Sequence, residues 1–311
     1  MIPAKSAKIN RLLAPIKMGL NLPKTIISFA LLGFGSAFFY DTPEDCSWSP
    51  VGDSDQVYLT CKLSSINSRL ERTNFSVIPS DSTVGLRIQC TESHVGSLDT
   101  AGFSSLNLLE ELVIDGCALE SLPPHAFKGL VSLKRLSINT RNLSILKLQQ
   151  DSFSHLPSLE KLDLSENSIR EFPAGEICKL SGLQYLNLSS NKIGSILDLG
   201  HQSCSQQPGN LLHQIQILDL SNNEITSLET NSLPTSASLT ELRLQKNFIR
   251  FIAPDVFSNS SIKLLDMSNN QINHLPATLF HNVPLQSLNL VNNSSLLLLE
   301  KAGVEVDKLQ E

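Results

Sequence analysis

One short pattern recurs along most of the chain and limits the possible folds more than any other feature. The pattern is L-x-x-L-x-L-x-x-N-x-I/L followed by about a dozen residues that often end in F-x-x-L. Strong copies begin at residues 159, 183, 215, 239, 262 and 285, and weaker copies begin at 83, 109 and 133. Neighbouring copies start 23 to 32 residues apart. Units repeated at such spacings stack one on the next instead of forming separate domains.

The L-x-L core of each copy indicates a β-strand, because alternate residues of a strand point to opposite faces. The leucines then point inward, and the residue between them points outward. The period and the motif together are typical of the leucine-rich repeat. We therefore predict an α/β repeat fold, a leucine-rich repeat solenoid (horseshoe) with parallel strands on the concave face. The inward pairs are Leu162/Leu164, Leu186/Leu188, Leu218/Leu220, Leu242/Leu244 and Leu265/Met267.

Two further positions recur in step with the strands. The amide at the Asn position should bond the backbone of its own turn and of the next turn, forming a ladder. Thr91, Cys117 and Arg141 occupy this position in the first three copies. A Phe position on the outer side predicts a packing spine rather than a ligand cage. The ladder residues are Asn167, Asn191, Asn223, Asn247, Asn270 and Asn293, and the spine is Phe103, Phe127, Phe153, Phe257 and Phe280, with Ile177 and Leu233 standing in.

The N-terminal segment has the composition of a secretory leader. Residues 1–24 carry five basic residues and no acid, and an uncharged apolar run follows from Thr25 to Tyr40. Gly35 and Ala37 have the spacing that a signal peptidase accepts. We expect a signal peptide at 1–37, with a retained signal anchor as the alternative, a cysteine-containing cap at 38–82, and about nine repeats at 83–311. The last of these repeats is expected to be truncated.

The six cysteines are expected to form three disulfides, because a leader directs the chain to an oxidising compartment. Cys46 and Cys61 should close the N-terminal cap. Cys90 and Cys117 are one repeat apart and should be neighbours on adjacent turns. Cys178 should pair with Cys204, which lies inside the longest interval between copies. A zinc site is not expected, since the chain has no Cys-x-x-Cys pair.

Because the leader predicts entry into the secretory pathway, the N-x-S/T sequons predict N-glycosylation. Asn293 falls on the buried ladder, so its sequon should be skipped in favour of Asn292. Asn187 lies on an outward strand position, where a glycan would obstruct the concave face. The expected glycosylation sites are Asn74, Asn142, Asn187, Asn259 and Asn292.

Charge and motifs exclude several classes of function. The chain has 24 Lys+Arg and 30 Asp+Glu, an acidic balance that argues against nucleic acid as a partner. No catalytic motif is present, so we expect no enzyme, no cofactor and no metal. Asp163, Asp219 and Asp266 align on outward positions and are interpreted as a solvated stripe that could serve recognition. The candidate partner-binding residues of the concave face are Glu110, Glu111, Asp115, Lys134, Arg135, Asp163, Tyr185, Asp219, Arg243 and Asp266.

The cap and the repeats together resemble the beginning of the ectodomain of insect Toll receptors, in particular the long-ectodomain, Tollo-like branch. The segments that carry the resemblance are YDTPEDCSWSP (40–50), LTCKLSSIN (59–67), TNFSVIP (73–79), LRIQC (86–90) and CKLSGLQYLNLSSNKI (178–193) followed by the insertion with Cys204.

The resemblance implies a single-pass receptor with many more repeats, a transmembrane helix and a cytoplasmic TIR domain. It implies signal transduction at the cell surface, in innate immunity or in epithelial and neural development. The partner would be a protein ligand or another leucine-rich repeat receptor, in a homo- or hetero-dimer, with membrane contact only through segments absent from this sequence. A secreted leucine-rich repeat protein, acting as a decoy or a matrix adaptor, is the alternative.

Overall fold

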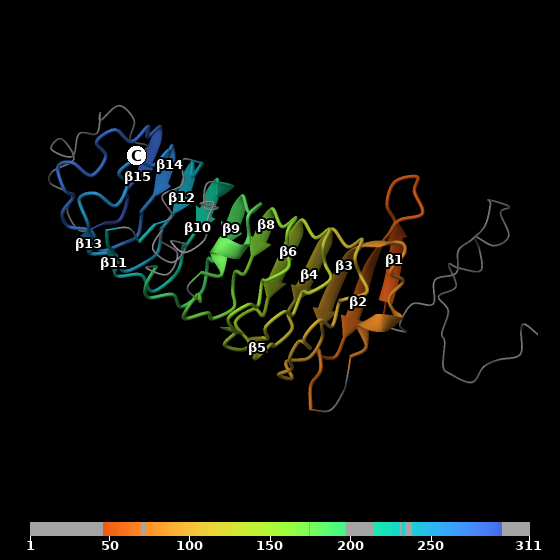
Figure 1. The fold of residues 1–311 in the computed structure, drawn as a ribbon. Helices are drawn as coiled ribbons and strands as arrows, with labels where there is room; N and C mark the ends of the chain where they lie inside the picture. Colours follow the sequence, from red (N-terminus) through yellow and green to blue (C-terminus); the bar gives the residue numbers. More distant parts are fainter. Residues whose placement is uncertain are drawn as a thin grey trace, which may run out of the picture.

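The computed structural model describes residues 46–69, 73–173, 175–196, 214–230, 232–233 and 238–293. Eleven strands form one gently curved sheet in which neighbours follow chain order (Figure 1). Only the first pair, β1 and β2, is antiparallel; the pairs from β2 to β15 are parallel. The strands are β1 (Cys46–Pro50), β2 (Val57–Leu63), β3 (Thr83–Cys90), β4 (Glu111–Asp115), β6 (Arg135–Asn139), β8 (Lys161–Asp163), β9 (Tyr185–Asn187), β10 (Ile217–Asp219), β12 (Glu241–Arg243), β14 (Leu264–Asp266) and β15 (Ser287–Asn289).

The register confirms the predicted solenoid, because each repeat places its central leucine beside that of the next repeat. Leu162 pairs with Leu186, Leu186 with Leu218, and Leu218 with Leu242. These leucines are fully buried and belong to one continuous core. The outer side carries short elements: β5 (Ser121–Leu122) paired with β7 (Lys147–Leu148), β11 (Ser227–Leu228) paired with β13 (Phe251–Ile252), and the 3-10 turns η1 (Phe75–Val77) and η2 (Ile177–Lys179).

The N-terminal end of the core is closed by a β-hairpin, which carries the disulfide that the sequence predicted. Cys46 and Cys61 lie opposite each other in the β1–β2 pair and form a disulfide. The ring of Tyr58 lies against Gly85, where an added Cβ would come within 2.1 Å of it. Gly85 therefore allows the cap to pack flat on the first repeat.

The Asn ladder is present with the predicted bonds inside each turn, but its inter-repeat bonds go to the preceding repeat and not to the next one. Asn191 donates to the carbonyl oxygens of Leu188 in its own turn and Leu164 in the preceding repeat, both at 2.9 Å. Its Oδ1 accepts the N–H groups of Asn167 and Ile169, also in the preceding repeat. The same pattern recurs at Asn167, Asn223, Asn247, Asn270 and Asn293. Each amide therefore ties its repeat to the one before it.

Other bonds link the repeats where the Asn ladder is missing. Cys117 occupies the ladder position of its repeat and forms a disulfide with Cys90, one repeat earlier. Arg141 occupies the position in the next repeat and holds Asp115 through Nε at 3.1 Å and Nη2 at 2.9 Å. A covalent bond and a bidentate ion pair thus supply cross-links between the first repeats.

The phenylalanines stack as the predicted spine. The rings of Phe103, Phe127 and Phe153 are buried and nearly parallel, with centroids 6.4 and 6.1 Å apart. Phe75 of η1 extends the stack toward the cap. After Phe153 the next ring is that of Phe172, five residues before the predicted stand-in Ile177.

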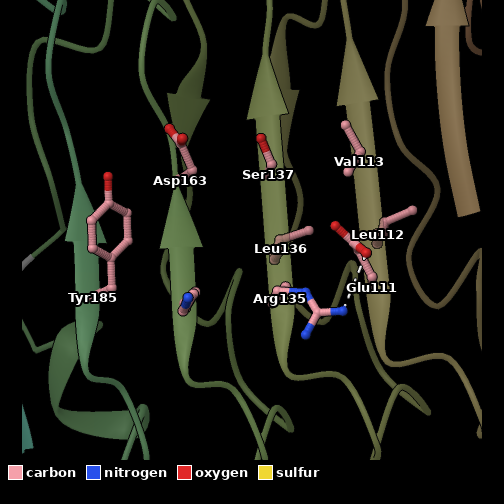
Figure 2. Close-up of a pocket in the computed structure, with 9 residues that line it drawn as sticks. Glu111, Leu112, Val113, Arg135, Leu136, Ser137, Asp163 and Tyr185 are labelled. Carbon is pink, nitrogen blue, oxygen red and sulfur yellow. Dashed lines mark hydrogen bonds and ion pairs between the residues drawn. The ribbon is translucent and has the colours of Figure 1, made fainter. Parts of the chain in front are cut away.

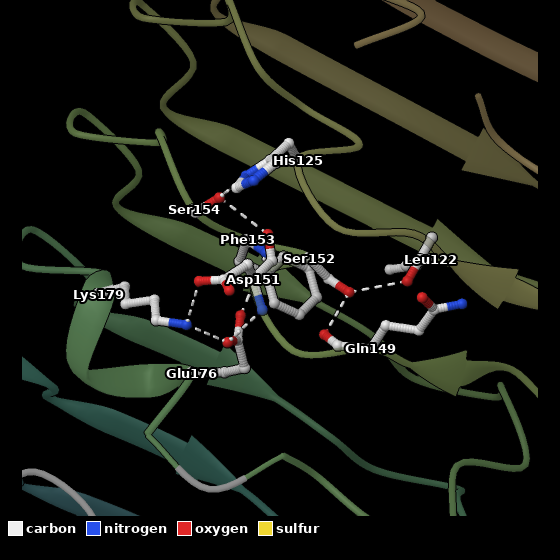
Figure 3. A network of polar contacts seen from close by, with 9 residues as sticks. All are labelled: Leu122, His125, Gln149, Asp151, Ser152, Phe153, Ser154, Glu176 and Lys179. Carbon is white, nitrogen blue, oxygen red and sulfur yellow. Dashed lines mark hydrogen bonds and ion pairs between the residues drawn. The ribbon is translucent and has the colours of Figure 1, made fainter. Parts of the chain in front are cut away.

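A polar network joins two repeats on the outer side (Figure 3). Glu176 is fully buried and accepts the N–H groups of Asp151 (2.7 Å) and Phe153 (3.3 Å). Lys179 forms ion pairs with Glu176 and with Asp151. The pKa of the Asp151 carboxyl is lowered by its hydrogen bond to Lys179 and by the charge of that lysine. Both carboxylate oxygens of Glu176 have hydrogen-bond or ion-pair partners. The network is therefore a structural link between the two repeats.

Some predictions fall on residues that the structure does not describe. The leader at 1–37 and the residues after 293 are among them. Cys178 is disulfide-bonded, and its predicted partner Cys204 lies outside the described residues. Within the described part of the chain, no helix has the length and apolar character needed to cross a membrane.

Candidate functional site: the concave face

Two rows of outward side chains cross the sheet on its concave face, and we name them by their place in the strand motif. The first row precedes the central leucine of each strand, and the second row follows it. In register, the first row is Glu111, Arg135, Lys161, Tyr185, Ile217, Glu241, Leu264 and Ser287, and the second row is Val113, Ser137, Asp163, Asn187, Asp219, Arg243, Asp266 and Asn289. Figure 2 shows β4 to β9 from this side, with both rows level across the strands.

Charged side chains predicted for recognition form ion pairs on and beside β4 and β6. Arg135 contacts Glu111 at 3.2 Å, as Figure 2 shows. Lys134 contacts Glu110 at 3.1 Å, and Arg141 holds Asp115. Each pair joins an acid of one repeat to a base of the next. The charges of this part of the face are therefore largely neutralised by ion pairs within the chain.

Of the aspartates in the second row only Asp219 is buried, while Asp163 and Asp266 are half-buried, and all three make a backbone contact that the sequence did not predict. Asp163, Asp219 and Asp266 each accept, through Oδ1, the backbone N–H of the serine two residues later, at 2.9 to 3.0 Å. Asn187 and Asn289 make the same contact. Asp and Asn side chains commonly close such turns. The Asp and Asn side chains of this row thus close the turn that follows their strand.

Asp219, Arg243 and Glu241 form a connected charged group on the face. Asp219 is only 6% exposed and also accepts the hydroxyl of Ser221. Arg243 lies on the next strand and bridges Asp219 at 3.2 Å and Glu241 at 2.6 Å. One cation between two carboxylates leaves this group with a net negative charge.

The sequence prediction missed an apolar component of the first row. Ile217 is adjacent to Tyr185 in register, and Leu264 lies two strands further on. Leu264 is 43% exposed, and Tyr185 and Ile217 are half-buried. The signal was present in the sequence, since both aliphatic residues occupy an outward position that is polar in most copies. The pKa of the Tyr185 phenol is raised, first by burial and then by the charges of Asp163 and Asp219.

The depression that the described strands form on this face is smaller than a usual small-molecule site. A shallow depression of about 170 Å³ lies between Glu111 and Tyr185 (Figure 2). Pockets for small ligands are usually about 300–1,000 Å³. Among the residues that the structure describes, no three His, Cys, Asp or Glu side chains are grouped to hold a metal ion. The arrangement suits contact with the surface of a macromolecule.

The sequons occupy different surfaces of the solenoid. Asn74, Asn142, Asn259 and Asn292 are exposed. Asn293 lies on the ladder, where its Nδ2 donates to two backbone carbonyls. Asn187 is half-buried in the second row, and its sequon coincides with the strand-ending motif that appears elsewhere as D-L-S or D-M-S. The turn geometry alone therefore accounts for Asn at this position.

Comparison with known proteins agrees with the fold. A model described as "Leucine rich repeat" matches residues 140–193 and 237–294, and a second leucine-rich repeat model matches residues 214–236. The solved structure of the TLR13–ssRNA13 complex superimposes with a TM-score of 0.59 at 25% identity, covering 68% of this chain and 28% of that chain. The described part of the chain is a leucine-rich repeat solenoid.

Relatives at the sequence level include receptors and other leucine-rich repeat proteins. Toll-like receptor 7 of Drosophila melanogaster is 35% identical over 192 residues, which cover 59% of this chain and 13% of that receptor. Lumican of Coturnix japonica is 25% identical over 271 residues, covering 78% of this chain and 76% of lumican. The chain is thus a leucine-rich repeat protein with Toll-like receptor relatives, and it spans a small share of the receptor.

Proposed function

We propose that this chain is the extracellular partner-recognition region of a Toll-type transmembrane receptor that acts in signal transduction, in innate immunity or in development. In this proposal residues 1–37 are a signal peptide, 38–82 the cap and 83–311 the repeats. The Tollo-like branch of insect Toll receptors is the proposed subfamily. The proposed partner is a protein, either a ligand or another leucine-rich repeat receptor.

The observation that carries the proposal is the outward surface of the parallel sheet. It presents Tyr185, Ile217 and Leu264 beside paired charges on strands tied together by buried amides. A rigid surface of this kind loses little conformational entropy on binding, which favours recognition. The similarity to a Toll-like receptor supports the receptor class.

The disulfides support an extracytoplasmic location. Cys46–Cys61 and Cys90–Cys117 join neighbouring strands or repeats, and such bonds persist in oxidising compartments. A binding module without catalytic activity is the function that we propose for this scaffold. A nucleic acid partner is disfavoured, because the carboxylates of the second row would repel phosphates.

A glycan inserted on the concave face tests the proposal. Asp266→Asn converts Asp266–Met267–Ser268 into a sequon, and the new amide retains an oxygen to accept the N–H of Ser268. Asp266→Asn with Ser268→Ala has the same charge change and no sequon. We expect the first variant to reduce binding of the secreted full chain to cells of the source organism, while the second binds about as well as the parent.

Equal binding by the two variants, with glycan occupancy verified by mass spectrometry, would contradict recognition through this face. The receptor class has a separate test, which is the sequence of the transcript beyond the codon for Glu311. An in-frame membrane helix and TIR domain would support the receptor. A stop codon would favour the second candidate, a secreted leucine-rich repeat binding protein, to which the similarity over most of lumican also points.

A further inference from the structure

Between β6 and β9 the outward side chains of the concave face change from paired charges to partly apolar residues. On β6 and directly beside it, the cations Lys134, Arg135 and Arg141 each have an acidic partner in the preceding repeat. From β9 onward the first row contains Tyr185, Ile217 and Leu264. Strand alternation holds these side chains away from the core, so burial within the solenoid does not explain an aliphatic residue there.

The apolar residues form a short strip across the sheet. Tyr185 and Ile217 are direct neighbours, and only Glu241 separates Ile217 from Leu264 in the row. Adjacent strands are about 4.8 Å apart, so the strip spans about 14 Å. That length suits one extended or hairpin segment of a protein partner.

Acidic side chains surround the strip. On β8 to β14 the two rows hold four carboxylates, Asp163, Asp219, Glu241 and Asp266, and two cations, Lys161 and Arg243, which gives 2 − 4 = −2. Arg243 is engaged by Asp219 and Glu241. Burial and, after it, the charges of Asp163 and Asp219 raise the pKa of the Tyr185 phenol.

We propose that the strip Tyr185–Ile217–Leu264 is the docking site for a protein segment in which apolar residues alternate with Lys or Arg. The apolar side chains of the segment cover Ile217 and Leu264, and a cation lies over the face of Tyr185, where the ring quadrupole and the nearby carboxylates attract it. The inference rests on the proposed recognition function and names the chemistry of the partner.

Asn187 lies in the second row beside Tyr185, so a glycan on it would cover the strip. Ser189→Ala removes this sequon and keeps the backbone N–H that bonds the Asn187 side chain. The full chain carrying Ser189→Ala is therefore the reference protein for the binding measurement, and the unmodified chain is measured beside it.

Fluorescence anisotropy with three synthetic peptides of equal length tests the inference. One peptide alternates Lys and Leu, the second alternates Glu and Leu, and the third alternates Lys and Ser. We expect the Lys/Leu peptide to bind at least about tenfold more tightly than either of the others. Replacing Ile217 and Leu264 together by Ser should weaken its binding about tenfold.

Two matched variants test separately where the Lys/Leu peptide binds and whether the carboxylates of the face contribute to its binding. Val131→Ser changes an aliphatic side chain that is 51% exposed and lies outside both rows, and it should leave binding of the Lys/Leu peptide unchanged. Asp163→Asn with Ser165→Ala removes one carboxylate, keeps an oxygen for the N–H of residue 165 and creates no sequon, and it should weaken binding in a salt-dependent manner. Leu264→Ser alone is the reserve variant if the double substitution fails to fold.

Equal binding of the Lys/Leu and Glu/Leu peptides would overturn the inference. So would binding that survives loss of Ile217 and Leu264 but is lost in Val131→Ser. Either result is compatible with a glycan at residue 266 that blocks binding of the native partner. In that case the concave face would still be the recognition surface, but the partner would not have the alternating apolar and basic chemistry proposed here. Tight peptide binding without such blockage would support the strip and count against recognition of the native partner through this face.

Discussion

Asn191 offers the sharpest test of how the repeats are held together. Its Oδ1 accepts the N–H groups of Asn167 (3.1 Å) and Ile169 (2.9 Å), and both residues are buried. Asn191→Ala leaves these donors without that acceptor in a site that is closed to water. An unsatisfied buried polar group costs about 2 kcal/mol, so the two together predict a loss of about 4 kcal/mol in the free energy of unfolding.

A neighbouring asparagine provides the matched control. Asn222 is exposed, has a left-handed backbone (φ 55°) and donates one hydrogen bond to Ser190 Oγ at 3.0 Å. Asn222→Gly retains access to this conformation and exposes no buried donor. It should cost about 1 kcal/mol or less.

The assay combines a global with a local measurement. Urea unfolding followed by circular dichroism gives the difference in free energy between variant and parent. Hydrogen exchange locates the change, because repeat stability depends mainly on nearest-neighbour contacts. We expect faster exchange at the amides of Asn167 and Ile169 in Asn191→Ala. The ladder argument would be refuted if this variant lost no more stability than Asn222→Gly and both amides stayed protected.

Three other perturbations test separate parts of the structure. Replacing Cys90 and Cys117 by Ala removes a link across 27 residues and should lower the free energy of unfolding by about 3.5 kcal/mol in the loop-entropy model; an unchanged urea midpoint would contradict this. Gly129 has φ 98°, and an added Cβ would lie 2.6 Å from a carbonyl oxygen of the preceding repeat. Gly129→Ala should therefore cost about 2–4 kcal/mol, and a thermal scan that shows no drop in Tm would exclude that strain. The lowered pKa of Asp151 means that its pairing with Lys179 stabilises the fold above the ordinary carboxyl pKa of about 3.9, with the benefit lost as pH falls through the folded value. Lys179→Gln should raise the Asp151 pKa in an NMR titration and flatten the acid limb of the stability profile, and an unmoved midpoint would exclude this ion pair as the cause.

The sequence alone determined the repeat fold, the inward leucines, the ladder positions and the cap disulfide. These features depend on the strand period of two and on contacts one repeat apart. Both are visible in a chain whose units stack in order. Leu162, Leu186 and Leu218 could therefore be assigned to one buried column from the repeat spacing alone.

The tertiary structure decided what the outward residues do. Spacing placed Asp163, Asp219 and Asp266 on the concave face, but only the folded chain shows each carboxylate closing its own turn. Likewise, spacing does not determine which charges meet, and the structure pairs Arg135 with Glu111.

The same distinction applies to the strip of Tyr185, Ile217 and Leu264. Its members are separated by 32 and 47 residues, and the long interval between the copies at 183 and 215 obscures their alignment in the sequence. Lateral strand pairing brings them into one row. Periodicity fixes which face a side chain occupies, whereas its neighbours on that face depend on the register between repeats and on the rotamers that packing allows.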